Sequence, residues 1–183
     1  MTNFAFVFPG QGSQSRKMLS ELRQESSVHH VFETASEILG YDLWGVIDND
    51  GEGALNQTKY TQPIMLAADI ALWHWWCDKT HARPAVVAGH SLGEFAALVA
   101  AEVISFEDAI KLVAKRAEFM QSAVKPGEGS MAAILGLDDS SIEKLCLQVS
   151  SDSEVLSAAN YNCPGQVVVA GHSGPVARIV KDA

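Results

Sequence analysis

The pentapeptide Gly89-His90-Ser91-Leu92-Gly93 constrains the fold of this chain more than any other segment. It follows the apolar run 85–88 and precedes the helix-forming stretch 94–99. A strand that enters a helix through so tight a turn forces the middle residue into a strained backbone conformation, and flanking glycines leave room for it. The pattern therefore predicts a strand–turn–helix unit with the Ser91 hydroxyl exposed above the sheet edge. The alternative interpretation is a glycine-rich loop in which Ser91 caps the helix.

Strands and helices alternate along the rest of the chain, as in an α/β fold with a parallel sheet. Apolar runs predict strands at 4–8 and 85–88. Helical patterns and their caps predict helices at 17–23, 28–39 (ending at Gly40), 61–78 (with Pro63 in the first turn), 94–101, and from 106 onward after Ser105. The turn formers 126–129 then separate two regions, so we expect an α/β domain at 1–126 and a smaller domain at 127–183.

The smaller domain has its own order of elements. It predicts a strand (131–135), a helix (142–149), two strands (155–159 and 167–170) and a helix from residue 173. This βαββα order is one strand short of the ferredoxin-like βαββαβ arrangement. We therefore expect these 183 residues to be the front part of a longer polypeptide.

Composition excludes several kinds of partner. With 48% hydrophobic and 19% charged residues the chain is globular in type. A net charge of -9 and a pI near 5.0, without a basic stripe, argue against nucleic acid. The N-terminus carries no leader pattern, and the apolar stretch 64–77 is interrupted by Asp69 and His74 and is too short to span a bilayer. We expect a buried core helix there and no membrane partner.

The three cysteines, Cys77, Cys146 and Cys163, form no CxxC pair. Their number and spacing predict neither a disulfide framework nor a zinc site, so we expect no metal and a location in the reducing cytosol.

Five segments, in this order, carry a family resemblance. They are Phe6-Val7-Phe8-Pro9-Gly10-Gln11-Gly12-Ser13-Gln14, Thr61-Gln62-Pro63, Gly89-His90-Ser91-Leu92-Gly93-Glu94, Arg116 with Phe119-Met120-Gln121, and Asn160-Tyr161-Asn162-Cys163-Pro164-Gly165-Gln166. Together they resemble the malonyl-CoA:acyl carrier protein transacylases of bacterial fatty acid synthesis. The resemblance implies an α/β-hydrolase-like core with a parallel sheet and a nucleophile elbow. It also implies an inserted ferredoxin-like subdomain, which is incomplete at the C-terminus of this chain.

The resemblance also implies a ping-pong acyl transfer. Ser91 would attack the malonyl thioester of CoA, hold the malonyl group as an ester and pass it to the phosphopantetheine thiol of acyl carrier protein. The backbone N–H groups of Leu92 and Gln11 would stabilise the oxyanion. From the residues alone, Gln11 is equally a turn residue of a glycine-rich loop. We expect no cofactor, because CoA and phosphopantetheine enter as carriers of the acyl group.

Arg116 is the residue that would select the substrate class. Malonyl carries a free carboxylate, which a guanidinium can clamp with two parallel charge-assisted hydrogen bonds. The sequence alone favours an arginine on a solvated helix face, and the family motif is what assigns it to the substrate. The resemblance adds further substrate-binding candidates: His90, Gln62, Asn160, Asn162 and Gln166. The last three are equally well explained as turn-forming residues before a strand.

The general base is the component that the sequence does not supply. A serine needs an adjacent base, usually imidazole, and none of the six histidines (His29, His30, His74, His81, His90 and His172) matches the family's base. Of these, His81 and His172 are expected in loops. In the family that histidine lies downstream of the position where this chain ends. We therefore expect the isolated chain to be essentially inactive as a transacylase.

Two other functions stay open at this point. A serine esterase or thioesterase of the α/β-hydrolase type shares the elbow and has no need of Arg116. A non-catalytic docking module would bind acyl carrier protein without forming an acyl-serine. Docking of an acidic carrier on an acidic chain needs a local basic patch, to which Lys111, Lys115 and Arg83 could contribute. We expect the protein to act as a monomer.

Overall fold

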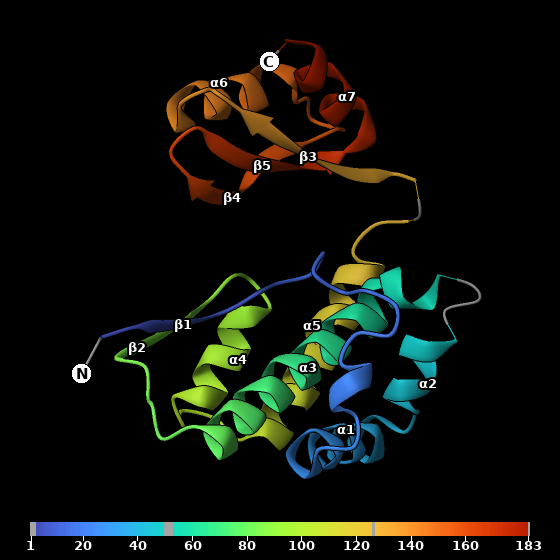
Figure 1. Ribbon diagram of the computed structural model, residues 1–183. Coiled ribbons are helices and arrows are strands. Elements are labelled where there is room, and N and C mark those ends of the chain that lie inside the picture. The colour runs from blue at the N-terminus through green and yellow to red at the C-terminus, as the bar shows by residue number, and fades with distance from the viewer. Residues whose placement is uncertain (1–2, 50–52, 126, 183) are drawn as a thin grey trace. The chain divides into compact units, whose positions relative to one another are not determined.

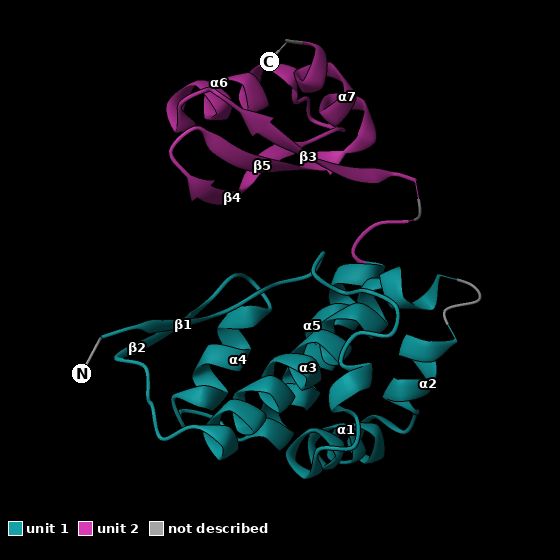
Figure 2. Cartoon of the chain, in the orientation of Figure 1, with its two compact units in different colours: residues 1–122 teal, residues 123–183 magenta. Residues whose placement is uncertain are grey.

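The computed structural model describes residues 3–49, 53–125 and 127–182 (Figure 1). The chain divides into two compact units, Met1–Ser122 and Ala123–Ala183 (Figure 2). The sequence predicts a domain boundary between residues 126 and 127. Residue 126 lies outside the described residues, as do residue 183, the first two residues and 50–52 of the turn-rich stretch before the long helix.

Unit 1 contains a two-stranded parallel sheet. Strands β1 (Ala5–Phe8) and β2 (Val86–Gly89) pair in register, with Ala5 opposite Val86 and Phe8 opposite Gly89. The carboxyl ends of parallel strands lie at the same edge of a sheet. The loop after β1 and the turn after β2 therefore start side by side, and the His90 N–H donates to the Phe8 carbonyl at 3.2 Å.

The helices of unit 1 pack around one long central helix (Figure 1). They are α1 (Ser26–Leu39), α2 (Leu43–Asp48), α3 (Thr58–Lys79), α4 (Gly93–Ala100) and α5 (Phe106–Ser122), with short 3-10 turns at Ser20–Leu22 and Ala54–Asn56. The predicted caps are confirmed: Gly40 ends α1 in the left-handed conformation, and the Ser105 hydroxyl accepts from the Asp108 N–H at 3.1 Å.

Helix α3 is the centre of this unit because it contacts α1, α4 and α5. Residues 61–71 are all buried, which explains why apolar side chains surround the axis instead of forming one stripe. The helix begins at Thr58, three residues before the predicted start, since the Thr61 N–H already bonds to the Gln57 carbonyl. Pro63 therefore lies inside the helix, where it removes one backbone hydrogen bond.

One helix predicted in unit 1 is wrong, and another helix of this unit was not predicted. The helix predicted at 17–23 is only the 3-10 turn Ser20–Leu22, because Lys17 and Leu19 both have a φ of 60°, outside the helical region. Helix α2 has no counterpart in the predicted elements. It is too short for a full amphipathic repeat, and it forms because Leu43, Trp44 and Ile47 are buried in the core.

Unit 2 is a three-stranded antiparallel sheet with two helices (Figure 2). Its elements are β3 (Gly129–Leu135), α6 (Asp139–Val149), β4 (Leu156–Cys163), β5 (Gln166–His172) and α7 (Ser173–Asp182), and the strand order is β3-β5-β4. Alternate residues of β5, Val167 and Val169, are buried with Ile142 of α6 and Ile179 of α7. This sequence of elements follows the predicted βαββα order.

Asp69 is a buried acid in the middle of α3. It is 4% exposed, and its Oδ2 has no hydrogen-bond partner among the residues that the structure describes. Burial disfavours the charged form and raises the pKa of Asp69 to about 7. In the described part of the chain, α3 and every other helix fall short of the length and apolarity that crossing a membrane requires.

Asp69 makes the stability of the protein depend on pH. In the unfolded chain an aspartate titrates near 3.9, so the folded form binds more protons between about pH 4 and pH 7. The free energy of unfolding should fall as pH rises through this window, by at most about 1.4 kcal/mol per pH unit from this group, and should level off above pH 7.

We expect Asp69→Asn to flatten this slope, whereas Asp152→Asn, at an exposed position, should leave it unchanged. Urea unfolding at pH 5, 6, 7 and 8 measures the effect. If the free energy of unfolding changes with pH in the same way for the wild type and for Asp69→Asn, Asp69 is not a neutral acid in the folded protein.

Candidate active site

The turn between β2 and α4 holds Ser91 in a strained conformation. Ser91 has a φ of 54°, which is uncommon for a residue with a side chain. The turn is closed by backbone bonds from the Gly93 N–H to the His90 carbonyl (2.9 Å) and from the Glu94 N–H to the Ser91 carbonyl (3.2 Å). This is the strand–turn–helix geometry that the sequence predicts.

The two glycines of the turn are required by close packing of backbone on backbone. A Cβ on Gly89 would lie 2.0 Å from the Gly93 carbonyl carbon, and a Cβ on Gly93 would lie 2.3 Å from the Phe8 carbonyl oxygen. Real Cβ atoms do not approach backbone atoms so closely. The first turn of α4 therefore rests directly on the ends of β1 and β2, which fixes the position of Ser91.

Arg116 joins the Ser91 hydroxyl to Gln62, which lies in a distant part of the sequence. Arg116 of α5 donates from Nη2 to Ser91 Oγ at 2.9 Å and from Nη1 to Gln62 Oε1 of α3 at 2.5 Å. Gln62 is fully buried, and Ser91 and Arg116 are half-buried. The Ser91 Oγ thus accepts a hydrogen bond from this guanidinium.

The loop after β1 joins the same network through Gln11. Its amide donates from Nε2 to Thr58 Oγ1 at 3.3 Å and accepts at Oε1 from Gln62 Nε2 at 3.4 Å. Gln62 Nε2 also lies 3.2 Å from Met120 Sδ on α5. Thr58 was missed by the sequence reasoning. Its spacing of four residues from Gln62 places both on one side of α3, a signal that becomes visible only once the start of the helix is known.

Two backbone N–H groups beside Ser91 have no acceptor within the described chain. The backbone hydrogen bonds found there include none donated by the N–H of Gln11 or of Leu92. The Leu92 side chain is fully buried and anchors the first turn of α4, whose N-terminal end carries partial positive charge. Together these groups can receive a developing negative charge.

The other predicted binding residues are His90, at the turn beside Ser91, and three residues of unit 2. His90 is exposed at the turn, and its carbonyl accepts from the Gly93 N–H. Asn160, Asn162 and Gln166 belong to unit 2, in the hairpin of β4 and β5, where the Asn162 side-chain amide donates to Gln166 Oε1 at 3.1 Å. All three are strand residues of this hairpin.

The remaining histidines have other surroundings. His29 pairs with Glu33 on α1 at 3.0 Å, and burial lowers the pKa of His74 on α3. The sequence predicts a loop at His172, but this residue is the last one of strand β5. Its Nδ1 accepts a hydrogen bond from the Val155 N–H at 3.0 Å. Residues 3–49, 53–125 and 127–182 contain no group of three His, Cys, Asp or Glu side chains that could hold a metal ion.

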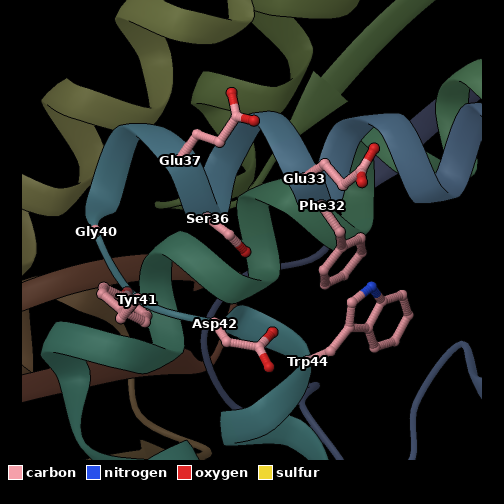
Figure 3. A pocket seen from close by; sticks show the side chains of 8 residues that line it. All are labelled: Phe32, Glu33, Ser36, Glu37, Gly40, Tyr41, Asp42 and Trp44. Carbon is pink, nitrogen blue, oxygen red and sulfur yellow. The ribbon is translucent and has the colours of Figure 1, made fainter.

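A separate pocket of about 470 Å³ lies between α1 and α2 (Figure 3). The carboxylates of Glu33, Glu37 and Asp42 surround it, and Phe32 stacks on Trp44 at its side with the ring centroids 4.0 Å apart. This acidic lining repels an anionic ligand. Ser91 with its cationic neighbour is therefore the better candidate for an active site.

Comparisons with known proteins agree with this choice. Residues 5–183 match the family model of an acyl transferase domain. A malonyl CoA-acyl carrier protein transacylase of Salmonella typhimurium is 52% identical over 179 residues, which are 97% of this chain and 58% of that protein. The chain thus spans about 58% of the length of the curated relatives it matches.

Solved structures show the same likeness. The malonyl CoA-acyl carrier protein transacylase of Coxiella burnetii matches with a TM-score of 0.92 and 46% identity, over 99% of this chain and 57% of that one. A malonyl-transacylase solved in complex with its type II PKS acyl-carrier protein matches with a TM-score of 0.89 and 47% identity, over 97% of this chain and 57% of that one. The mixed α/β architecture, with one parallel and one antiparallel sheet, is therefore shared with known transacylases.

The backbone contacts at the turn give a paired prediction. Gly93→Ala should destabilise the protein by more than about 3 kcal/mol, because the new Cβ meets a carbonyl oxygen that cannot move without breaking the sheet edge. Gly45→Ala inside α2 should be neutral or stabilising by up to about 1 kcal/mol, since its nearest neighbour is the flexible Asp42 carboxylate. Urea unfolding of both variants tests this contrast, and equal effects would contradict the packing argument.

Proposed function

Because this chain belongs to the acyl transferase domain family, we propose that it carries the nucleophile and the acyl-binding site of a malonyl transfer from malonyl-CoA to acyl carrier protein in fatty acid synthesis. The observation that carries this proposal is the 2.9 Å contact between Arg116 Nη2 and Ser91 Oγ. This contact supports the proposal because a guanidinium beside the Ser91 hydroxyl can bind a carboxylate. A neutral ester or an acetyl group would gain nothing from that cation.

In this proposal the transfer takes place in two half-reactions, acylation of Ser91 and then transfer of the malonyl group to the carrier thiol. Ser91 Oγ bonds to the thioester carbonyl carbon, the carbon–sulfur bond breaks, and the Oγ proton passes through a general base to the sulfur of CoA. The phosphopantetheine thiol of the carrier then attacks the malonyl-serine ester. The carbon–oxygen bond breaks, and the thiol proton returns to Ser91 Oγ. One site can serve both thiols because each meets the same acyl carbonyl.

Arg116 binds the free carboxylate of the malonyl group in this proposal. A single methylene separates that carboxylate from the carbonyl carbon under attack, so a guanidinium in contact with Ser91 Oγ is within reach of it. Two parallel charge-assisted hydrogen bonds hold the acyl group in the orientation for attack.

The oxyanion of the tetrahedral intermediate is assigned to the N–H groups of Leu92 and Gln11. Neither N–H group has a backbone acceptor in the described part of the chain. Gln11 lies just after the end of β1 and Leu92 just after the end of β2, and these two strand ends are paired with each other. Donors that are fixed before the reaction stabilise the developing charge without a cost of reorganisation.

We further propose that the core is α/β-hydrolase-like over 1–126 and that 127–183 forms a ferredoxin-like subdomain. In this proposal Asn160, Asn162 and Gln166 line the pantetheine channel, and His90 is a substrate-binding residue. The general base comes from the part of the relatives' length that this chain does not span. The protein acts as a monomer without a cofactor, in the cytosol, where its three free cysteines would stay reduced.

Covalent labelling tests the proposed function. After incubation of the 183-residue chain with malonyl-CoA, intact-mass spectrometry should find a malonyl adduct that is absent from Ser91→Ala. The adduct should form several orders of magnitude more slowly than in the Salmonella typhimurium relative, because the base is missing. Hydrolysis of neutral esters without an adduct would indicate a serine esterase, and binding of acyl carrier protein without an adduct would indicate a docking module.

The role of Arg116 has its own test. Arg116→Ala should slow labelling of Ser91 by malonyl-CoA about 10- to 100-fold more than labelling by acetyl-CoA, because only malonyl loses a charge-assisted pair. Arg83→Ala is the matched control, since Arg83 is exposed and donates to the carbonyls of Thr80 and Ala82. Equal losses for the two acyl donors would remove Arg116 from the acyl-binding site.

A further inference from the structure

Gln62 is a polar residue that lies wholly inside unit 1. Its side chain is 1% exposed, yet it makes three polar contacts, to Arg116, Met120 and Gln11. Buried amides are retained where their hydrogen-bonding groups are satisfied. The contacts of Gln62 join three separate elements, namely α3, α5 and the loop after β1.

The chemistry of its neighbours fixes the orientation of the Gln62 amide. The Arg116 guanidinium can only donate, so it must face Oε1. Met120 Sδ and Gln11 Oε1 can only accept, so they must face Nε2. A flipped amide would set donor against donor and acceptor against acceptor. Gln62 therefore has one satisfied orientation.

This orientation fixes the guanidinium at the nucleophile. Nη1 is held by Gln62 at 2.5 Å, which leaves Nη2 at Ser91 Oγ. Arg116 and Met120 are one helical turn apart on α5, so Gln62 holds α5 at two successive turns. Bidentate recognition of a carboxylate needs a guanidinium plane of fixed orientation, which the flexible stem of an arginine does not supply by itself.

The same amide also holds the loop that carries the second oxyanion donor. The Gln11 side chain is bound by Thr58 and by Gln62, which are one turn apart on α3. The two hydrogen bonds of the Gln62 amide strengthen each other. When the Arg116 guanidinium donates to Oε1, it polarises the amide, and Nε2 becomes a stronger donor to Gln11. The acyl-binding cation and the oxyanion loop therefore share a single connecting residue.

We propose that Gln62 is a positioning residue that couples carboxylate recognition at Arg116 to the oxyanion loop at Gln11, and that selectivity for carboxylate-bearing acyl groups depends on this coupling. The inference rests on the proposed function and deepens it. Without Gln62, Arg116 still carries its charge but loses its fixed orientation, and the Gln11 side chain loses one of the two hydrogen bonds described above.

Two variants of Gln62 separate positioning from charge. Gln62→Met has a similar length and keeps the packing, but it offers Arg116 no oxygen. Gln62→Glu keeps an oxygen for Arg116 but sets a carboxylate against the two acceptors, and it competes with the acyl carboxylate for the guanidinium. The matched controls are Gln121→Met and Gln121→Glu, at an exposed position of α5 next to Met120.

The main readout is the ratio of malonyl to acetyl labelling of Ser91, measured by intact mass on the 183-residue chain with malonyl-CoA and acetyl-CoA. Calorimetric titration with malonate and with acetate gives the same preference without any reaction. We expect Gln62→Met to lower both preferences about tenfold, the effect of losing one hydrogen bond to a charged group. Gln62→Glu should lower them further, and the Gln121 variants should keep them.

The ratio of malonyl to acetyl labelling separates a loss of positioning from a general loss of folding. It also tests the inference separately from the proposed function. Partial unfolding would reduce labelling by malonyl-CoA and by acetyl-CoA to the same extent, so the ratio of the two would not change. An unchanged ratio in well-folded Gln62 variants, beside a wild type that prefers malonyl, would overturn the inference and leave the proposed function intact. A wild type without any preference for malonyl or malonate would overturn both.

Discussion

The close contact of backbone with backbone at the ends of β1 and β2 is the constraint on which the rest of the site depends. Gly93 lies against the Phe8 carbonyl, and Gly89 lies against Gly93, with no space for a side chain at either position. This contact sets the start of α4, the strained φ of Ser91 and the path of the loop after β1. The side chains of Gln62 on α3 and Arg116 on α5 then meet at a serine whose position is already determined.

Features that are marked by neighbouring residues could be predicted from the sequence. Features that depend on contacts between distant parts of the chain could not. The turn at Ser91, the end of α1 at Gly40 and the cap at Ser105 are each marked in the sequence by a few neighbouring residues, and all three were predictable. Helix α2 depends on burial of Trp44 and its neighbours by elements elsewhere in the chain, so its short local pattern gave too little signal.

The candidate site shows the same division. Ser91, Arg116 and Gln62 could be named from motifs, but the contacts among them join positions from three elements. The amide of Gln62 has a defined orientation only because α3, α5 and the loop after β1 pack together. No pattern along the chain encodes that arrangement. The placement of Asn160 in β4, where a turn was an equal interpretation, depends in the same way on pairing with β5.

The pairing of residue 5 with residue 86 has a consequence for the order of folding. Strand β2 can join β1 only after the chain between them, which includes α1 and α3, has been brought into a compact form, because closing a loop of that length is entropically unfavourable until other contacts offset it. The turn at Ser91 rests on this pairing. The turn at Ser91 is therefore expected to form late, on a helical scaffold that is already in place.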